Sequence, residues 1–291
     1  MEVILYILIF LMGTTFGSFC TLAVYRIPLG KDITHERSFC PNCNHRLEFL
    51  DLIPIWSYIF LGGKCRYCGK KIRIRYLILE VTMGIVFVLF ALSMKIRVLD
   101  LAINGTEYLL KTITYFFIIA LYITFLAITA GIDKERKEIQ TPMLLFGVIL
   151  AVIYTIYVCV IYNLSMQTYV IYISLFLILA LYNIYYLRKN LKNNYAIQNI
   201  MLIIIMLTFT YEGVTILSII LALLAMAIYT LIKEISNRKN KQMVDKNNKV
   251  SKAKKDKKKI EQNKIPVAFY LSISNIITFL AVGIMQAYSL M

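Results

Sequence analysis

Four cysteines occur as two pairs with the spacing of metal-binding turns. The pairs are Cys40-Pro-Asn-Cys43 and Cys65-Arg-Tyr-Cys68, with 21 residues between them. Two such turns can bring four thiolates to a tetrahedral Zn²⁺ at sulfur–metal distances of about 2.3 Å. Four sulfur ligands leave no open coordination position, so the spacing predicts a structural zinc site rather than a catalytic one.

Two alternatives remain for these thiols, a redox-active dithiol pair and inert thiols. Disulfides are disfavoured in the cytosol, so a cytosolic location favours metal ligation. Gly69 follows the second pair and can adopt the positive φ that such a turn requires.

His35 and His45 lie near the first pair, but four cysteines already complete the site, so we interpret them as surface residues. Cys20 and Cys159 lie in apolar runs and are predicted to be packing residues.

The composition places these cysteines in a membrane protein. Apolar residues make up 59% of the 291-residue chain, charged residues make up 16%, and the mean hydropathy is +0.70. A soluble protein cannot bury so much apolar surface, whereas each bilayer span needs about 20 apolar residues. The first apolar stretch, 3–25, is too long for a signal-peptide core and lacks a basic segment before it, so we expect a retained span.

Apolar runs and their breaks predict eight helical spans, because an isolated span must satisfy its backbone hydrogen bonds internally. The predicted spans are 3–25, 76–94, 109–132, 142–162, 168–187, 196–211, 213–232 and 266–288. The sixth is short and weakly delimited, which leaves seven as the alternative count. The predicted fold class is an all-α polytopic membrane protein of about eight transmembrane helices with a small cytosolic four-cysteine zinc module.

The basic residues predict the orientation and explain the net charge of +16. If 26–75 is cytosolic, then 133–141, 188–195 and 233–265 are cytosolic too, and these four segments hold 29 of the 32 Lys and Arg residues. Cytoplasmic loops collect Lys and Arg. Topology therefore accounts for the charge, and we expect no specific nucleic-acid partner.

Three parts follow from this organisation: a first transmembrane helix in 1–25, a cytosolic zinc-binding module in 26–75, and a membrane domain in 76–291. Within the last part, 233–265 is strongly cationic and nearly devoid of aromatic residues, so a flexible cytosolic loop is expected. Two roles remain open for this loop, contact with anionic membrane lipid and a solvated linker that enforces topology.

Residues 17–84 carry a nearly continuous series of motifs. From the N-terminus, the motifs are Gly17-Ser18-Phe19, Tyr25-Arg26-Ile27-Pro28, Arg37-Ser38, the first cysteine pair, Asp51-Leu52-Ile53-Pro54, Ser57-Tyr58, Gly63, the second cysteine pair with Gly69, Ile72, Arg75-Tyr76 and Glu80. The series resembles the opening of bacterial type IV prepilin peptidases, which are membrane aspartic proteases of the GxGD type. The eight-span fold and cytosolic zinc-bearing insertion of that family agree with the hydropathy and charge pattern.

The resemblance implies two activities and their partners. One is cleavage of the leader peptide of type IV prepilins and pseudopilins at the cytosolic face of the bacterial plasma or inner membrane. The other is methylation of the new N-terminus with S-adenosylmethionine as donor, an activity associated with the zinc-bearing region. The donor-binding residues are unknown, since the sequence has no glycine-rich nucleotide fingerprint.

The resemblance also implies a catalytic pair of carboxyls. In the family one Asp ends a span and begins a short cytosolic loop, and Asp133 matches it; without the resemblance it would be an ordinary interfacial acid. The family's second Asp closes a GxGD motif, which here falls on Asn193-Asn194-Tyr195-Ala196. Proteolysis needs one ionised and one protonated carboxyl at a shared water, so this chain is predicted to be inactive as a protease.

Two explanations for Ala196 remain open. Either alanine replaces an aspartate of the natural protein, or the chain is a naturally divergent member that binds prepilins or serves another role. No acidic residue lies within 139–211 that could substitute for the missing one. The natural codon at position 196 distinguishes the two explanations.

Glu80 is an acidic residue near the start of the predicted span 76–94. A carboxylate about one turn inside a span is costly unless it is paired. Its expected partner is the zinc module, the methyl donor or a basic leader, or alternatively Arg75 or Arg73.

A non-catalytic scaffold that binds prepilins or assembly partners is the alternative function. A transporter is disfavoured because the polar residues gather at the cytosolic boundary and not at the midplane.

Overall fold

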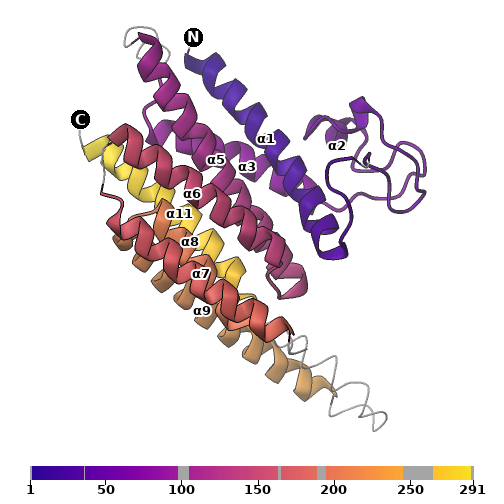
Figure 1. The fold of residues 1–291 in the computed structure, drawn as a ribbon. Coiled ribbons are helices and arrows are strands. Elements are labelled where there is room, and N and C mark those ends of the chain that lie inside the picture. The colour runs from indigo at the N-terminus through magenta and orange to yellow at the C-terminus, as the bar shows by residue number, and fades with distance from the viewer. Residues whose placement is uncertain are drawn as a thin grey trace.

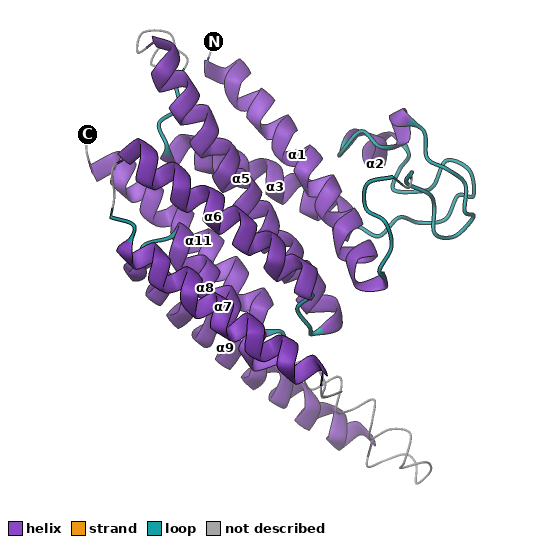
Figure 2. Cartoon of the chain, in the orientation of Figure 1, coloured by secondary structure: helices purple, strands orange, loops and turns teal. Residues whose placement is uncertain are grey.

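The computed structural model describes residues 2–35, 37–97, 105–162, 165–188, 195–244 and 265–289. Most of the predicted basic loop, and Asn193 and Asn194 of the GxGD-like position, lie outside the described residues. Figure 2 shows that the described part of the chain is helical apart from its connecting loops. Two isolated antiparallel bridges occur within the module, Phe39 with Arg46 and Lys64 with Lys71.

The helices form one elongated bundle, and the cysteine module stands beside it (Figure 1). Their bounds are α1 Glu2–Arg26, α3 Arg75–Ser93, α5 Gly105–Arg136, α6 Thr141–Tyr162, α7 Gln167–Arg188, α8 Tyr195–Phe209, α9 Glu212–Val244 and α11 Val267–Ser289. The module contributes the short helices η1 Ile27–Leu29, η2 Phe49–Asp51 and α2 Trp56–Phe60. We call the end of the bundle where α1 ends and α3 begins the module end.

The predicted membrane architecture is confirmed. Seven described helices are long and apolar enough to cross a membrane, and α8 is a shorter apolar helix of 15 residues. The weakly delimited sixth span is therefore present as a short helix. Two helices extend beyond their predicted spans, since α5 continues to Arg136 and α9 to Val244. Backbone hydrogen bonding continues into the polar segments where the apolar run has already ended.

Helices α1 and α3 pack backbone to backbone through glycine. A β-carbon at Gly13 would lie 2.7 Å from the carbonyl oxygen of Met83, and one at Gly17 would lie 2.7 Å from the Cα of Glu80. The two glycines have the small-xxx-small spacing that allows membrane helices to approach closely. This contact fixes α3 against α1 at the level of the module.

Gly17→Leu is therefore expected to force the two helices apart and to lower the stability of the protein. Overpacking of a tight contact costs about 1–3 kcal/mol. The measurement is the thermal unfolding midpoint of the protein in detergent. Thr15→Leu is the matched control, since Thr15 lies on the exposed side of the same helix. Equal midpoints for the two variants would contradict the packing described here.

Helix α5 is the buried centre of the bundle. In its most apolar stretch 78% of residues are buried, a larger share than in any other membrane-length helix of the described chain. Helix α11 packs against α5, α9 and α3. In the interior, the Tyr122 hydroxyl donates to Oδ1 of Asn275 at 2.7 Å, and Nδ2 of Asn275 lies 3.4 Å from the Ser218 hydroxyl. These buried bonds join α5, α11 and α9, as polar side chains commonly do between membrane helices.

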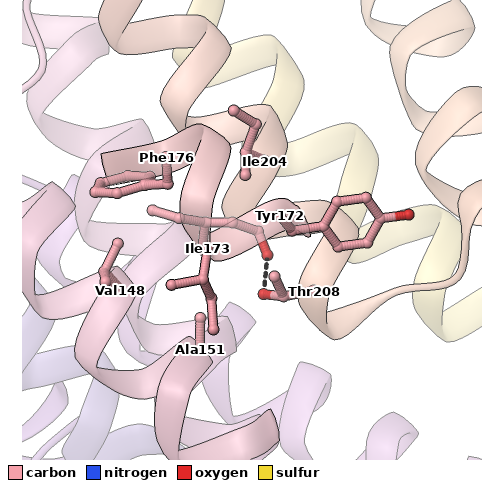
Figure 3. Close-up of a pocket in the computed structure, with 8 residues that line it drawn as sticks. Val148, Ala151, Tyr172, Ile173, Phe176, Ile204 and Thr208 are labelled. Atoms are coloured by element: carbon pink, nitrogen blue, oxygen red, sulfur yellow. Dashed lines mark hydrogen bonds between the residues drawn. The ribbon is translucent and has the colours of Figure 1, made fainter. Parts of the chain in front are cut away.

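Figure 3 shows a small cavity among α6, α7 and α8. Its volume is about 10 Å³, and its lining includes Val148, Ala151, Ile173, Phe176 and Ile204. The hydroxyl of Thr208 is bonded to the carbonyl oxygen of Ile205 in its own helix at 2.7 Å. A space of this size holds about one water, so it is a packing gap and not a substrate site.

Candidate functional site

The four predicted ligand cysteines lie together. Their sulfur atoms are all within 4.8 Å of one another. A tetrahedral metal with bonds of about 2.3 Å would hold its sulfur ligands about 3.8 Å apart, so a small contraction suffices. Cys40 and Cys65 are buried, whereas Cys68 is exposed. The cluster can hold a metal ion, and its four thiols fit a structural Zn²⁺ better than any metal that prefers oxygen ligands.

The two cysteine turns repeat one geometry. In the first, the Cys40 carbonyl accepts the Asn44 N–H at 2.9 Å, and in the second the Cys65 carbonyl accepts the Gly69 N–H at 2.9 Å. Asn44 has φ 55° and Gly69 has φ 66°, so both turns close with a left-handed residue at the same position. The positive φ predicted for Gly69 is confirmed. Asn tolerates this conformation better than most residues other than glycine.

The electrostatics of the cluster favour a thiolate at Cys68. Hydrogen bonds from the backbone N–H of Lys70 and from the side-chain amide of Asn42 lower the pKa of the Cys68 thiol to about 6. The Asn42 nitrogen lies 3.6 Å from the sulfur. A thiolate is the form that ligates a metal, so this donor set is prepared for binding.

Neither histidine of the module joins the cluster. The His45 ring lies against Tyr67 with a centroid distance of 3.6 Å, and His35 Nδ1 lies 2.8 Å from Oδ2 of Asp32. Both are exposed. This agrees with their interpretation as surface residues.

Two acidic side chains tie the module together and to the bundle. Asp51 accepts bonds from Nε of Arg66 at 2.8 Å and from the hydroxyl of Tyr67 at 3.1 Å. Glu80 in α3 accepts the backbone N–H of Ile55 at 2.7 Å. Of the partners expected for Glu80, the module is thus confirmed, whereas Arg75 forms its ion pair with Glu135.

Asp133 lies in the last turn of α5 at the module end, and its side chain is fully buried. One carboxylate oxygen accepts the Tyr195 hydroxyl at 2.6 Å, and the other accepts the Phe269 N–H at 2.9 Å. The Tyr195 oxygen in turn accepts the Val267 N–H at 2.8 Å. Asp133 therefore brings the end of α5, the start of α8 and the N-terminus of α11 together, where a helix N-terminus stabilises an anion.

Tyr195, the residue before the predicted second catalytic position, is the one that contacts Asp133. Ala196 itself is exposed. One turn further into α8, Gln198 and Asn199 are buried, and both polar atoms of the Gln198 side chain lack a hydrogen-bond partner among the described residues. The pairing of Asp133 with position 196 stays a prediction, while the closeness of this turn of α8 to Asp133 is a property of the fold.

Tyr195→Phe is expected to destabilise the junction of α5, α8 and α11. The change removes a donor to Asp133 and an acceptor for Val267, and an unsatisfied buried polar group costs about 1–3 kcal/mol. The midpoint of thermal unfolding in detergent measures the effect. Tyr211→Phe is the matched control because Tyr211 is 58% exposed. A midpoint for Tyr195→Phe equal to that of the control would contradict the role given to this hydroxyl.

Sequence reasoning did not identify Tyr195 or Phe269 as contacts of Asp133. Tyr195 is 62 residues and Phe269 136 residues away along the chain. The signal for Tyr195 was its place in the first turn of an apolar helix that follows a basic loop. Phe269 contributes a backbone N–H, which every residue but proline offers, so its side chain carried no signal.

Comparison with known proteins places the similarity in the N-terminal part of the chain. Residues 11–94 match the family described as the bacterial peptidase A24 N-terminal domain. The match includes the four cysteines and Glu80 and ends before Asp133. No solved structure matches the chain at a significant level.

Three relatives illustrate the extent of this similarity, each named prepilin leader peptidase/N-methyltransferase. The chain is 37% identical over 81 residues to the protein of Myxococcus xanthus, covering 28% of this chain and 24% of that protein. The protein of Vibrio cholerae is 35% identical over 94 residues, which cover 30% of this chain and 37% of that protein. The protein of Bacillus subtilis is 40% identical over 80 residues, which cover 28% of this chain and 32% of that protein. The matches thus span less than two fifths of these relatives.

The fold and the cysteine cluster define a multi-pass, all-helical membrane protein with a four-cysteine module that can hold a metal. The comparisons confirm the resemblance to type IV prepilin peptidases, carried by the domain over residues 11–94.

Proposed function

We propose that this chain acts on type IV prepilins and pseudopilins at the cytosolic face of a bacterial plasma or inner membrane. The activities implied by its relatives are cleavage of the leader peptide and methylation of the new N-terminus. One observation carries the proposal beyond the N-terminal likeness: the buried Asp133 carboxylate contacts the first turn of α8 at the module end. A second carboxyl in that turn would complete an aspartic protease site.

The proposed proteolytic chemistry follows from two carboxyls that share a water. The ionised carboxyl takes a proton from the water as it attacks the scissile carbonyl, and the protonated one donates a hydrogen bond to the carbonyl oxygen. Asp133 supplies one group and residue 196 the other. With alanine at 196 the second group is missing, so the chain in this form is inactive as a protease.

The four-cysteine cluster has a structural role in this proposal. Zn²⁺ held by Cys40, Cys43, Cys65 and Cys68 supplies folding free energy to a module with few buried apolar side chains. Methyl transfer from S-adenosylmethionine to the new N-terminus is supported by the names of the relatives alone. The proposed orientation, with this module in the cytosol, rests on the distribution of Lys and Arg.

A non-catalytic scaffold is the second candidate, and one observation favours it. Both carboxylate oxygens of Asp133 are engaged by protein donors, and the side chain is fully buried. A carboxylate held in this way stabilises the helix junction and is closed off from solvent. In this alternative the chain binds prepilins or assembly partners without altering them.

The test uses the chain with Ala196, reconstituted in liposomes with a prepilin or with a pilin whose leader has already been removed. We expect the prepilin to bind and keep its leader, and the shortened pilin to gain one methyl group from isotopically labelled S-adenosylmethionine. Binding without methyl transfer would support the scaffold. Failure to bind either pilin form, by a protein that is folded and holds zinc, would contradict both candidates.

A further inference from the structure

The module exposes an apolar patch that its own fold does not cover. We call it the 49–60 patch, and it consists of Phe49, Leu50, Leu52, Trp56, Ile59 and Phe60. Phe49 is 81% exposed and Phe60 79%. Beside them lies a groove of about 350 Å³ that Ile53, Trp56 and Phe60 help to line. Contiguous apolar surface of this kind on a small module marks an interaction site.

The bond between the module and α3 gives the depth of this patch. Glu80 lies five residues after the start of α3, which corresponds to about 7.5 Å along the helix axis. Because the Ile55 N–H is bonded to Glu80, α2 begins inside the length of the membrane-spanning helix and not beyond its end. Figure 1 shows the same arrangement, with α2 level with the second half of α1.

The backbone at Ile55 is turned to make this contact. Ile55 has φ 64°, a region that costs a β-branched residue free energy and persists only where the surroundings enforce it. The turn directs the Ile55 N–H toward Glu80 and starts α2 at Trp56. The position of α2 beside α3 is therefore held by a specific contact.

The charges around the patch match a bilayer surface. Residues 49–61 contain a single charged residue, Asp51, whose carboxylate is paired with Arg66. The following segment, 62–75, carries six Lys or Arg and no acidic residue. A short apolar, aromatic segment followed by cations is typical of elements that insert at the interface of a membrane with anionic lipid. Trp in particular is enriched at that level.

We propose that the 49–60 patch is a membrane-inserted element: Trp56, Ile59 and Phe60 enter the lipid leaflet at the module end, beside α1 and α3. The insertion holds the cysteine module flat against the membrane surface. A competing occupant is the apolar helix of a pilin substrate. Lipid is favoured because the Glu80 contact, which lies within this chain and needs no bound substrate, places α2 at membrane depth.

The test exploits Trp56, which is the only tryptophan of the chain. The full chain is reconstituted in vesicles of phosphatidylcholine and phosphatidylglycerol whose acyl chains carry bromine at a shallow or a deep position. We expect blue-shifted emission that loses most of its intensity with shallow bromine and less with deep bromine. Aqueous iodide should quench Trp56 weakly. No substitution is needed, so a folding defect cannot obscure the result.

Two variants in a Trp56→Phe background serve as matched probes. Phe60→Trp should be quenched by brominated lipid as Trp56 is, whereas Arg46→Trp, at an exposed position of the first cysteine turn, should be quenched by iodide. Red-shifted Trp56 emission quenched by iodide and unaffected by bromine would overturn the proposal. Shielding of Trp56 that develops only after a prepilin is added would also overturn it, and would identify the patch as a substrate groove.

Discussion

Cys65→Ser is expected to abolish the zinc binding that we propose for the four-cysteine cluster and to unfold the 26–75 module. The substitution leaves three thiolates for a metal that requires four ligands in structural sites. Structural zinc contributes about 10–16 kcal/mol to the folding of small domains, far more than the apolar contacts of this module supply. Elemental analysis of the purified protein should fall from about one zinc per chain to nearly none, and limited proteolysis should cut within 26–75.

Cys159→Ser is the matched control for this experiment. Cys159 lies in α6, away from the four clustered sulfur atoms, and its replacement should leave the zinc content unchanged. Full zinc in Cys65→Ser would contradict the assignment of Cys65 as a ligand. If the chain with all its cysteines holds no zinc but forms a reversible disulfide between the cysteine pairs, that result would instead support the redox alternative.

Ala196→Asp is expected to give the chain leader-peptidase activity. Tyr195 reaches Asp133 from the first turn of α8, and residue 196 is the next residue of the same turn. General acid–base catalysis by a positioned group contributes about 10²–10⁴-fold to the rate. We expect cleavage of a prepilin in liposomes to rise at least by that factor, measured as the mass of the shortened pilin.

Two further variants make the result interpretable. Ala196→Asn has nearly the same shape as Ala196→Asp but no ionisable group, so it should leave the prepilin uncut. Asp133→Asn combined with Ala196→Asp should abolish the new activity because one carboxyl is again missing. An uncut prepilin with Ala196→Asp, in a protein that is folded and binds prepilin, would contradict the alignment of position 196 with the second catalytic residue.

The membrane helices were predictable because hydropathy reports the solvent that surrounds a segment. The span predicted at 142–162 corresponds to α6 at Thr141–Tyr162. The same criterion underestimated the lengths of α5 and α9, because both helices continue into charged sequence. Hydropathy locates the part of a helix that lies in lipid, whereas the helix ends where its backbone hydrogen bonds end.

The cysteine cluster was predictable for a different reason. Each cysteine pair forms a turn of a few residues, so its spacing records the local geometry directly. The junction around Asp133 depends on helix packing between distant segments, which no local pattern encodes. The depth of α2 was equally hidden, because a helix of five residues is too short for a hydropathy window that detects spans.

The proposed site around Asp133 is tested most directly by a photo-cross-link from a prepilin whose cleavage junction carries a photoreactive residue. The prepilin is bound to the chain with Ala196 in liposomes and irradiated, and the joined peptides are identified by mass spectrometry. We expect cross-links to the last turn of α5, the first turn of α8 and the start of α11, around Asp133, Ala196 and Phe269. Cross-links confined to the opposite end of the bundle, near Ser93 and Gln167, would contradict the proposed site.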